Sequence, residues 1–255
     1  MISVVTPSLN QADFLEKTIL SVLDQNYQPF EHLVIDGAST DGTIEILEKY
    51  RHLIWTSEKD RGQAHAVNKG FRLAKGDIIG WLNSDDVYTP GTFKKVNAVF
   101  QERPEVDMVF SHCLWIDKDD NIIRLLQGRD PARFPVLKHP CYIPQPTIFI
   151  RSAVLEKTGY LNETYSWIMD FDFWRRVSMN HEILLVRDIF ACFRYHNTSK
   201  TAKHQKIFKY EAKKSFFANG GSVFSPYYFE SFIKPVLLSV FVYNPLVKRL
   251  FFYCK

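Results

Sequence analysis

The chain has 255 residues, of which 46% are hydrophobic and 24% charged, which is typical of a globular protein and excludes a disordered chain. Its length allows a large core without disulfide staples, so the four cysteines are expected to be free thiols in a reducing compartment. The net charge of +4 is uneven, because residues 201–255 hold nine basic and two acidic residues (+7), which leaves −3 for residues 1–200. A mildly acidic body with a basic tail is therefore expected, and no nucleic-acid partner.

The first hundred residues alternate strand and helix patterns, which predicts βαβ units and a mostly parallel sheet. The N-terminus lacks a basic region and a long apolar core, so we expect a first strand there rather than a signal peptide. Strands are expected at 2–6, 30–35, 52–56 and 77–82, with helices over 15–23, 43–50 and 64–74.

The second half is less regular. A Pro-rich stretch, 128–146, is predicted to be a loop over the site, because loops of this length are often functional. Strands are expected at 106–116, 121–127, 146–151, 183–186 and 189–195, with helices at 152–158, 169–179 and 203–214.

The C-terminal segment 216–255 is rich in aromatic and apolar residues flanked by lysines. Its longest charge-free run, 235–247, has 13 residues, whereas a membrane-spanning helix needs about 20. Aromatic and basic composition favours a segment lying in the membrane interface. The alternative is a pair of helices packed on the body or on a second subunit, and the oligomeric state stays open.

An acidic tip at 83–86, Asn-Ser-Asp-Asp, follows the apolar run 77–82. Ligands of open α/β sheets bind outside the carboxyl ends of the strands. The adjacent carboxylates of Asp85 and Asp86 repel each other unless a cation neutralises them, and oxygen ligands favour Mg²⁺ or Mn²⁺. The alternative is an Asp-rich turn that caps the next helix.

Seven motifs follow one another in an order that resembles the family 2 glycosyltransferases, which have a GT-A fold. The resemblance covers about residues 1–200 and is carried jointly by the motifs. They lie at 4–10, 35–43, 57–64, 68–71, 74–86, 145–151 and 170–176.

This resemblance implies an α/β GT-A domain at 1–205, in which 1–100 bind the nucleotide and 101–205 the acceptor. A helical, aromatic and basic extension at 206–255 would follow. The resemblance also implies a nucleotide-sugar donor, for which a UDP-sugar is the commonest guess, a divalent metal (Mn²⁺ or Mg²⁺), and inversion at the anomeric carbon. The expected acceptor is a glycan or lipid-linked molecule of surface polysaccharide synthesis, with the enzyme cytoplasmic and peripheral on the inner face of the cell membrane.

The family's metal motif, Asp-x-Asp, appears here as Asn83-Ser84-Asp85. The resemblance implies that Asp85 is the metal ligand and that His196, after the last core strand, lies against metal or diphosphate. An amide is a poorer metal ligand than a carboxylate, so Asn83 is expected to bond the ribose of the donor. Asp86 either contacts the metal or caps the next helix.

Five further residues are expected, by resemblance, on the donor. Thr6, Pro7 and Asn10 would line the nucleoside pocket, and Asp36 would accept a hydrogen bond from the nucleobase. Arg61 is a candidate for base or phosphate contact, with a solvated residue at the start of a helix as the alternative.

Inverting transfer needs a carboxylate that takes the proton of the acceptor hydroxyl. The resemblance assigns this role to Asp170. Residues two apart do not share a helix face, so Asp172 is expected to pair with Arg175 or Arg176 or to cap the helix. Where family members often carry Glu, this chain has Met169.

Two other functions stay open. A sugar nucleotidyltransferase would need a Gly- and Arg/Lys-rich phosphate loop near the N-terminus, which the chain lacks. A non-catalytic nucleotide-sugar-binding subunit is supported by the departures at Asn83 and Met169. The missing G-x-G-x-x-G motif disfavours a dinucleotide oxidoreductase.

Overall fold

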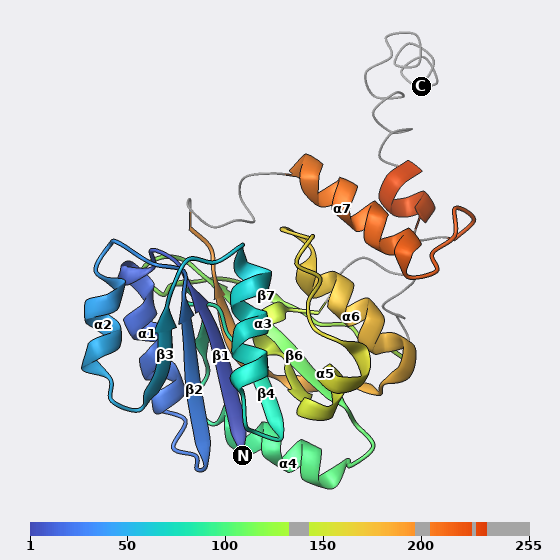
Figure 1. Ribbon diagram of the computed structural model, residues 1–255. Helices are drawn as coiled ribbons and strands as arrows, with labels where there is room; N and C mark the ends of the chain where they lie inside the picture. The colour runs from blue at the N-terminus through green and yellow to red at the C-terminus, as the bar shows by residue number, and fades with distance from the viewer. Residues whose placement is uncertain (133–142, 197–204, 226–227, 234–255) are drawn as a thin grey trace, which may run out of the picture.

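The computed structural model describes residues 1–132, 143–196, 205–225 and 228–233. A twisted sheet forms the centre, with helices packed on both faces (Figure 1). Its strand order is β3-β2-β1-β4-β8-β6-β9-β5, and β7 pairs with β6 outside this path. The first four strands are parallel, whereas β8 joins β4 and β6 in antiparallel pairing. The expected α/β GT-A-like fold, a mixed and mostly parallel sheet flanked by helices, is confirmed.

The N-terminal half is built from the predicted alternation of strands and helices. Each crossover returns the chain to the same end of the sheet, so the segments after the strands gather at one edge. The elements are β1 (Ile2–Ser8), α1 (Ala12–Leu23), β2 (Phe30–Asp36), α2 (Thr43–Lys49), β3 (Leu53–Ser57), α3 (Gln63–Leu73), β4 (Ile78–Trp81), β5 (Val87–Tyr88) and α4 (Thr92–Glu102).

The second half adds strands beyond β4 and ends in a helix beside α6. The elements are β6 (Met108–Ile116), β7 (Ile122–Leu126), the 3-10 turn η1 (Gln145–Thr147), β8 (Phe149–Arg151), α5 (Ser152–Thr158), α6 (Met169–Asn180), β9 (Ile183–Arg194), α7 (Gln205–Ala218) and the single-turn helix η3 (Phe229–Ile233).

Two of these elements differ from the expectation. The late strands predicted at 183–186 and 189–195 are one strand, β9, because it pairs with β6 through register shifts near His112. The strand expected at 146–151 is shorter, because Gln145–Thr147 forms the 3-10 turn before β8. Most of the predicted Pro-rich loop lies outside the described residues.

Successive apolar residues of the strands point to opposite faces of the sheet, and both faces pack against helices. On one face α3, α5 and α6 cover Val5 and Ile79, and Ala212 and Phe216 of α7 belong to the same core. On the other face α1, α2 and α4 cover the opposite side chains of the same strands. Helix α7 is therefore packed on the body through buried apolar residues.

Helix α3 lies unusually close to β1. A Cβ atom at Gly70 would stand 2.2 Å from the Cγ1 of Val5, so only glycine permits this approach. The close packing fixes the second half of α3 against β1.

Because β2 contains a buried histidine, His32, we expect the free energy of unfolding to fall in acid. Burial and the charge of nearby His52 lower the pKa of His32 to about 3, against about 6.5 in an unfolded chain. The unfolded state therefore gains a proton that the folded state does not, and stability decreases as pH falls from about 6.5 towards about 3. At pH 5 the cost is about 2 kcal/mol.

The variant His32→Gln can still bond the Thr6 hydroxyl, which lies 2.9 Å from the His32 Nε2. We expect its unfolding free energy to fall by about 2 kcal/mol less than that of the unmodified protein between pH 7 and pH 5. Urea unfolding at both pH values measures the difference, and equal decreases in the two proteins would contradict the prediction.

No helix among the described residues is long and apolar enough to cross a membrane. Two of the four cysteines, Cys113 and Cys192, lie in the described part of the chain, and both are free thiols, as expected. The other two lie outside it.

Candidate active site

Asp36 ends β2 and is completely buried. Its carboxylate accepts hydrogen bonds from the backbone N–H (2.9 Å) and hydroxyl (2.5 Å) of Ser39 and from the Ser57 hydroxyl (2.7 Å). The structure therefore places the predicted nucleobase contact at the expected strand end, beneath the side chain of Ser39.

The three residues predicted to line a nucleoside pocket differ in what they expose. Thr6 and Pro7 are buried in β1, and the Thr6 side chain is bonded to His32, so its hydroxyl faces the interior. Asn10 is exposed and left-handed, with φ 52°, a conformation that Asn tolerates. Its Oδ1 accepts the Thr40 N–H at 2.9 Å, and its own N–H donates to the Ser39 hydroxyl. Of these three residues, only Asn10 offers its side chain to solvent.

Asn83, in the tip after β4, bonds residues of α3, β4 and η1 and one residue of the tip itself. Its Oδ1 accepts hydrogen bonds from Gln63 Nε2 of α3 (2.9 Å) and Trp81 Nε1 (3.0 Å). Its Nδ2 donates to Gln145 Oε1 (2.7 Å) and to Asp86 Oδ2 (3.4 Å). An amide supplies both donors and acceptors, and these contacts together need both. This explains why Asn83 stands where the Asp-x-Asp motif has its first Asp.

The variant Asn83→Asp is expected to destabilise the protein. The new carboxylate would replace a donor with an acceptor opposite the oxygen of Gln145, leaving this partly buried acceptor without its hydrogen bond. The expected loss is about 1–3 kcal/mol of unfolding free energy. Urea unfolding with an unchanged slope would show it, and a midpoint equal to that of the unmodified protein would disprove it.

Asp85 and His196 come together from distant parts of the chain. The His196 Nε2 lies 3.1 Å from the Asp85 Oδ2, and the imidazole packs on Phe14, with ring centroids 4.7 Å apart. The Asp85 side chain is 18% exposed and therefore reachable from solvent. Arg194, buried in β9, donates through Nε to the Asp85 carbonyl at 2.8 Å and fixes the backbone of the tip.

Ser84 and Asp86 lie inside the tip. Both are buried, and their carbonyl groups accept the Thr18 hydroxyl of α1 at 3.0 and 2.7 Å. The Asp86 Oδ1 accepts the Arg194 backbone N–H at 2.9 Å. Burial, and then the charge of Asp85, raises the pKa of Asp86 well above its usual range. Asp86 thus ties the tip to β9, while Asp85 is the carboxylate that a ligand can reach.

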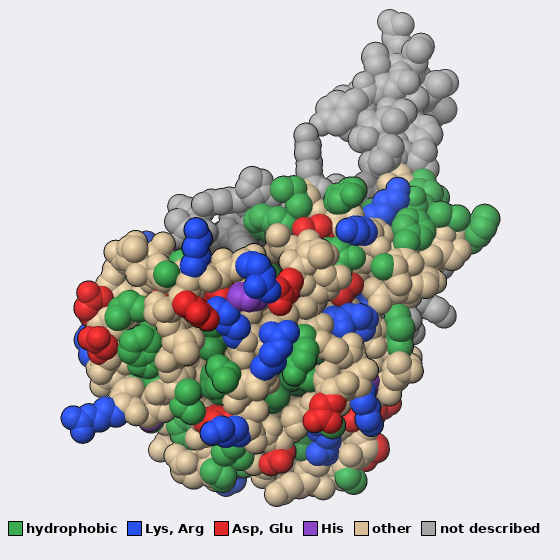
Figure 2. All heavy atoms as spheres, in the orientation of Figure 1, with side chains coloured by type: hydrophobic (Ala, Val, Ile, Leu, Met, Phe, Trp, Pro, Cys, Tyr) green, Lys and Arg blue, Asp and Glu red, His purple; other side chains and the backbone are tan. Residues whose placement is uncertain are grey.

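Arg61 stands just before α3 and bridges to the second half of the chain. Its guanidinium is 71% exposed and lies 2.7 Å from the Glu163 Oε2. The other oxygen of Glu163 accepts the Nδ2 of Asn68 at 3.0 Å. Figure 2 shows acidic and basic side chains side by side over α3 on this face.

A small hollow connects the two halves. Its lining includes Gln63, which bonds Asn83 of the tip, and Met169, the first residue of α6. Asp170 follows Met169 in the first turn of α6, is partly exposed, and its Oδ1 accepts the N–H of Phe171 at 2.7 Å. The start of α6 thus borders a hollow whose wall is tied to the acidic tip through the hydrogen bond from Gln63 to Asn83. The remaining lining residues are Arg61, Gly62, Ala64, His65, Glu163, Tyr165 and Ser166.

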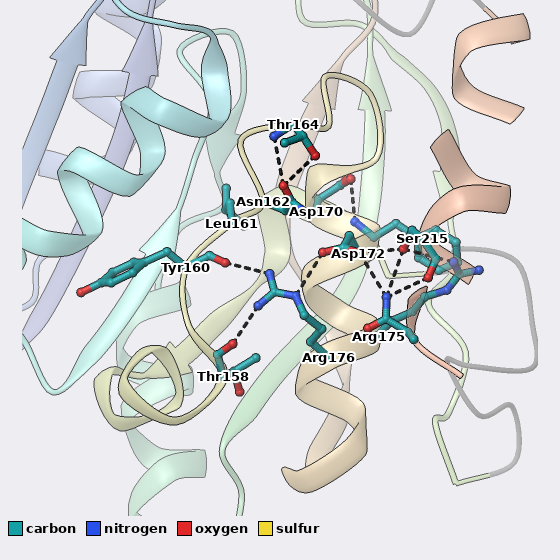
Figure 3. A network of polar contacts seen from close by, with 12 residues as sticks. Thr158, Tyr160, Leu161, Asn162, Thr164, Asp170, Asp172, Arg175, Arg176 and Ser215 are labelled. Atoms are coloured by element: carbon teal, nitrogen blue, oxygen red, sulfur yellow. Dashed lines mark hydrogen bonds and ion pairs between the residues drawn. The ribbon is translucent and has the colours of Figure 1, made fainter. Parts of the chain in front are cut away.

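Asp172 points into a polar network (Figure 3). Its Oδ2 lies 3.1 Å from the Nε of Arg176, whose other nitrogens donate to the carbonyls of Thr158 and Tyr160. The expected pairing of Asp172 with one of the two arginines is confirmed. Asp172 therefore stabilises α6, and Asp170 is the carboxylate left near the hollow.

A divalent cation fits the donors at the tip. Asp85 and His196 offer an oxygen and an imidazole nitrogen 3.1 Å apart, of which the Asp85 side chain is partly exposed and the His196 side chain is buried. Mg²⁺ is commonly bound through one or two protein ligands, with substrate phosphates and water completing its coordination. No group of three or more His, Cys, Asp or Glu side chains able to hold a metal ion occurs among the described residues. A site that depends on the substrate for its other ligands is consistent with both observations.

Sequence reasoning gave no role to several residues that organise the site. Gln63 and Gln145 hold Asn83, Arg194 holds the backbone of Asp85, and Glu163 holds Arg61. Gln63 and Gln145 lie within the family motifs, and Arg194 lies two residues before His196, so their positions in the sequence could have indicated them. Glu163 had no such signal. Lys200 and Lys203, which the sequence offers as cations to close over the phosphate of a bound donor, fall outside the described residues.

The family model for glycosyl transferase family 2 matches residues 3–174, which is 172 of the 255 residues. The chain belongs to this family and is a glycosyltransferase. The acidic tip and Asp170 both lie within the matched span, whereas His196 and helix α7 lie beyond it.

The chain is similar to the putative teichuronic acid biosynthesis glycosyltransferase TuaG of Bacillus subtilis, with 37% identity over 109 residues, 40% of this chain and 43% of TuaG. Its fold is similar to that of S. aureus TarS in complex with UDP-GlcNAc, with 19% identity, a TM-score of 0.71 and coverage of 88% of this chain and 67% of that one. Mannosyltransferase PcManGT from Pyrobaculum calidifontis, in complex with GDP-Man and Mn²⁺, gives 20% identity and a TM-score of 0.62, covering 93% and 68%. At such identities the two structures show the shared fold alone.

Proposed function

We propose that the chain is a metal-dependent inverting glycosyltransferase that moves one sugar from a nucleotide-diphosphate sugar to a hydroxyl of a glycan or lipid-linked acceptor. The observation that carries the proposal is the hollow beside α3. Gln63 on its lining bonds Asn83 of the acidic tip, and Met169 on its lining precedes Asp170. A candidate diphosphate site and a candidate base thus share one region.

The donor is proposed to bind along the carboxyl ends of β1, β2 and β4. A carboxylate has about four acceptor sites, and Asp36 uses three of them on Ser39 and Ser57. A nucleobase N–H would take the fourth or displace the Ser39 hydroxyl, with Thr6, Pro7 and Asn10 beside the nucleoside. UDP- and GDP-sugars are both candidates, because the compared structures hold UDP-GlcNAc and GDP-Man.

Asp170 is proposed to accept the proton of the acceptor hydroxyl as its oxygen attacks the anomeric carbon. The bond from that carbon to the phosphate oxygen breaks, and the diphosphate leaves with the electron pair, so one displacement inverts the configuration. Asp85 and His196 would hold the divalent ion. When bound, this ion neutralises charge that develops on the diphosphate. Asn83, Ser84 and Arg61 are proposed on the ribose and phosphate side of the donor.

The test is an assay of the purified chain with a panel of UDP- and GDP-sugars, with and without Mn²⁺. Release of nucleoside diphosphate that requires Mn²⁺ supports the proposal. Release of pyrophosphate from sugar phosphate and nucleoside triphosphate would indicate a nucleotidyltransferase. A thermal shift with a donor but no turnover with any acceptor or water would indicate the non-catalytic binding subunit.

We also propose a place for the reaction, at the cytosolic face of the membrane in surface polysaccharide synthesis. The similarity to TuaG, whose name refers to teichuronic acid biosynthesis, supports this pathway class. Figure 2 shows hydrophobic side chains gathered over α7 and the segment after it, where Tyr210 is 70% and Phe224 94% exposed. Lysines 213 and 214 lie on the same helix. Such surfaces bind anionic membrane interfaces. The test is co-sedimentation with lipid vesicles. Binding to anionic but not to neutral vesicles is expected, and no binding to either kind would reject the proposal.

A further inference from the structure

Glu211 lies in the middle of α7, beyond the span matched by the family model, and is only 8% exposed. Its two carboxylate oxygens lie 3.0 and 3.2 Å from the backbone nitrogen of Ser166, and Oε2 accepts the N–H of Trp167 at 2.8 Å. A buried charge is costly unless it is hydrogen-bonded, and here two consecutive backbone N–H groups meet it. The contact joins segments about 45 residues apart in the chain.

The residues that Glu211 holds lead directly into α6. The helix begins at Met169, and its N-cap residue, Ile168, makes no side-chain capping bond. The start of a helix carries partial positive charge, so a carboxylate beside it is stabilising, and hydrogen bonds to a charged acceptor are about twice as strong as neutral ones. Glu211 therefore fixes the path of the chain three to four residues before Asp170.

Further contacts show that α7 is firmly placed against α6. The carbonyl of Ala212 accepts the Arg175 Nη1 at 3.2 Å, and the hydroxyl of Ser215 donates to the Asp172 Oδ1 at 2.7 Å (Figure 3). Asn219 donates to the same oxygen at 3.2 Å. Glu211 and Ser215 are four residues apart and lie on one face of α7, and Asn219 follows directly after the end of the helix. This face delivers the Glu211 carboxylate to a fixed position.

We propose that Glu211 is a positioning residue for glycosyl transfer, which orients Asp170 by anchoring the Ser166–Trp167 backbone. Helix α7 is then an integral part of the active site. The proposal rests on the function proposed above, in which Asp170 is the base. Ser166 and Met169 line the same hollow, so a displaced segment would move both the base and the wall of the acceptor side.

The test compares Glu211→Gln with Asn219→Ala in the full-length protein. The glutamine keeps the size of the side chain but removes its charge and turns one oxygen into a donor that faces the backbone N–H groups. Asn219→Ala loosens the same helix pair at a site beyond the segment that precedes Asp170. Hydrogen exchange of the amides of residues 164–170, the melting temperature, and kcat and donor KM are measured for each.

For Glu211→Gln we expect exchange at 164–170 to be at least about tenfold faster and kcat to fall about tenfold or more, with donor KM within about twofold, because a base misplaced by about 1 Å can cost 10²-fold in rate. Asn219→Ala should lower the melting temperature and leave exchange at 164–170 and kcat close to those of the unmodified protein. Unchanged exchange in Glu211→Gln, or faster exchange with unchanged kcat, would overturn the inference. Lack of transfer by the unmodified protein would instead overturn the proposed function, and the exchange result would still show whether the anchor exists.

Discussion

Replacement of Asp170 by Asn is expected to lower kcat by about 10²–10⁴-fold, the usual contribution of a general base. The amide cannot accept the proton of the acceptor hydroxyl, although it keeps the shape of the side chain and can still accept the N–H of Phe171. Donor binding should change little, because the donor is proposed to bind along the ends of β1, β2 and β4. Steady-state kinetics with acceptor, together with donor affinity by calorimetry, separate the two effects.

Asp172→Asn is the matched control, because the same chemical change is made two residues away on another face of α6. It weakens the contact with Arg176 and leaves an amide that can still accept the Ser215 hydroxyl. The expected result is a lower melting temperature with kcat nearly unchanged. If Asp172→Asn abolished transfer while Asp170→Asn retained it, the assignment of the base would be reversed.

The N-terminal half of the fold could be predicted because its signals are local. Strands β1 to β4 are apolar runs ended by polar tips, and the helices between them carry apolar residues three and four apart. The motif at the end of β4 placed Asp85 at the sheet edge. The pair that Asp85 forms with His196 was implied only by the resemblance, since 111 residues separate the two.

Long-range pairing set the elements that the sequence did not reveal. Strand β5 has two residues and exists because Val87 and Tyr88 pair with β9. Strand β9 contains the charged residues 187–188, which interrupt its apolar pattern although the strand continues through a register shift. A two-residue strand carries no periodicity, and a bulge hides the periodicity of a longer one.

The C-terminal extension shows the same limit of prediction from sequence, here for the candidate site rather than for the fold. Composition predicted a basic helix near 203–214, and the helix is present as α7. The pattern gave two uses for the extension, a membrane contact or packing on the body, and the described residues show that α7 packs on the body through Ala212 and Phe216. A surface that also meets a membrane stays a proposal. No spacing rule could have paired Glu211 with the backbone of Ser166.

The acidic tip combines two carboxylates with opposite environments. Asp86 is buried, and its raised pKa favours the neutral form, whereas Asp85 is partly exposed beside His196. Only the second is exposed enough for the proposed contact with a cation and a phosphate. The division of roles between adjacent residues follows from how the chain turns: the Thr18 hydroxyl fixes one side of the tip and Arg194 the other.

Asp85→Ala is accordingly expected to abolish binding of Mn²⁺ at the tip, with an affinity at least about 100-fold lower, because it removes the only carboxylate of the proposed pair and leaves His196 alone. Metal binding stabilises the folded state by mass action, so the thermal shift that Mn²⁺ and a donor produce together should disappear. Titration of Mn²⁺ followed by electron paramagnetic resonance measures the affinity without any need for turnover.

Asp86→Asn provides the control for this prediction. The asparagine resembles the neutral acid that the buried site favours and can still accept the Arg194 N–H through its Oδ1. Its Mn²⁺ affinity is therefore expected to stay within about twofold of the original, although it stands next to Asp85. Equal losses in both variants would mean that the cation contacts the buried carboxylate or that the tip has collapsed, and the melting temperature distinguishes these outcomes. If Asp85→Ala kept its Mn²⁺ affinity, the metal would not bind at this edge of the sheet. The proposed stabilisation of the leaving diphosphate would then be wrong.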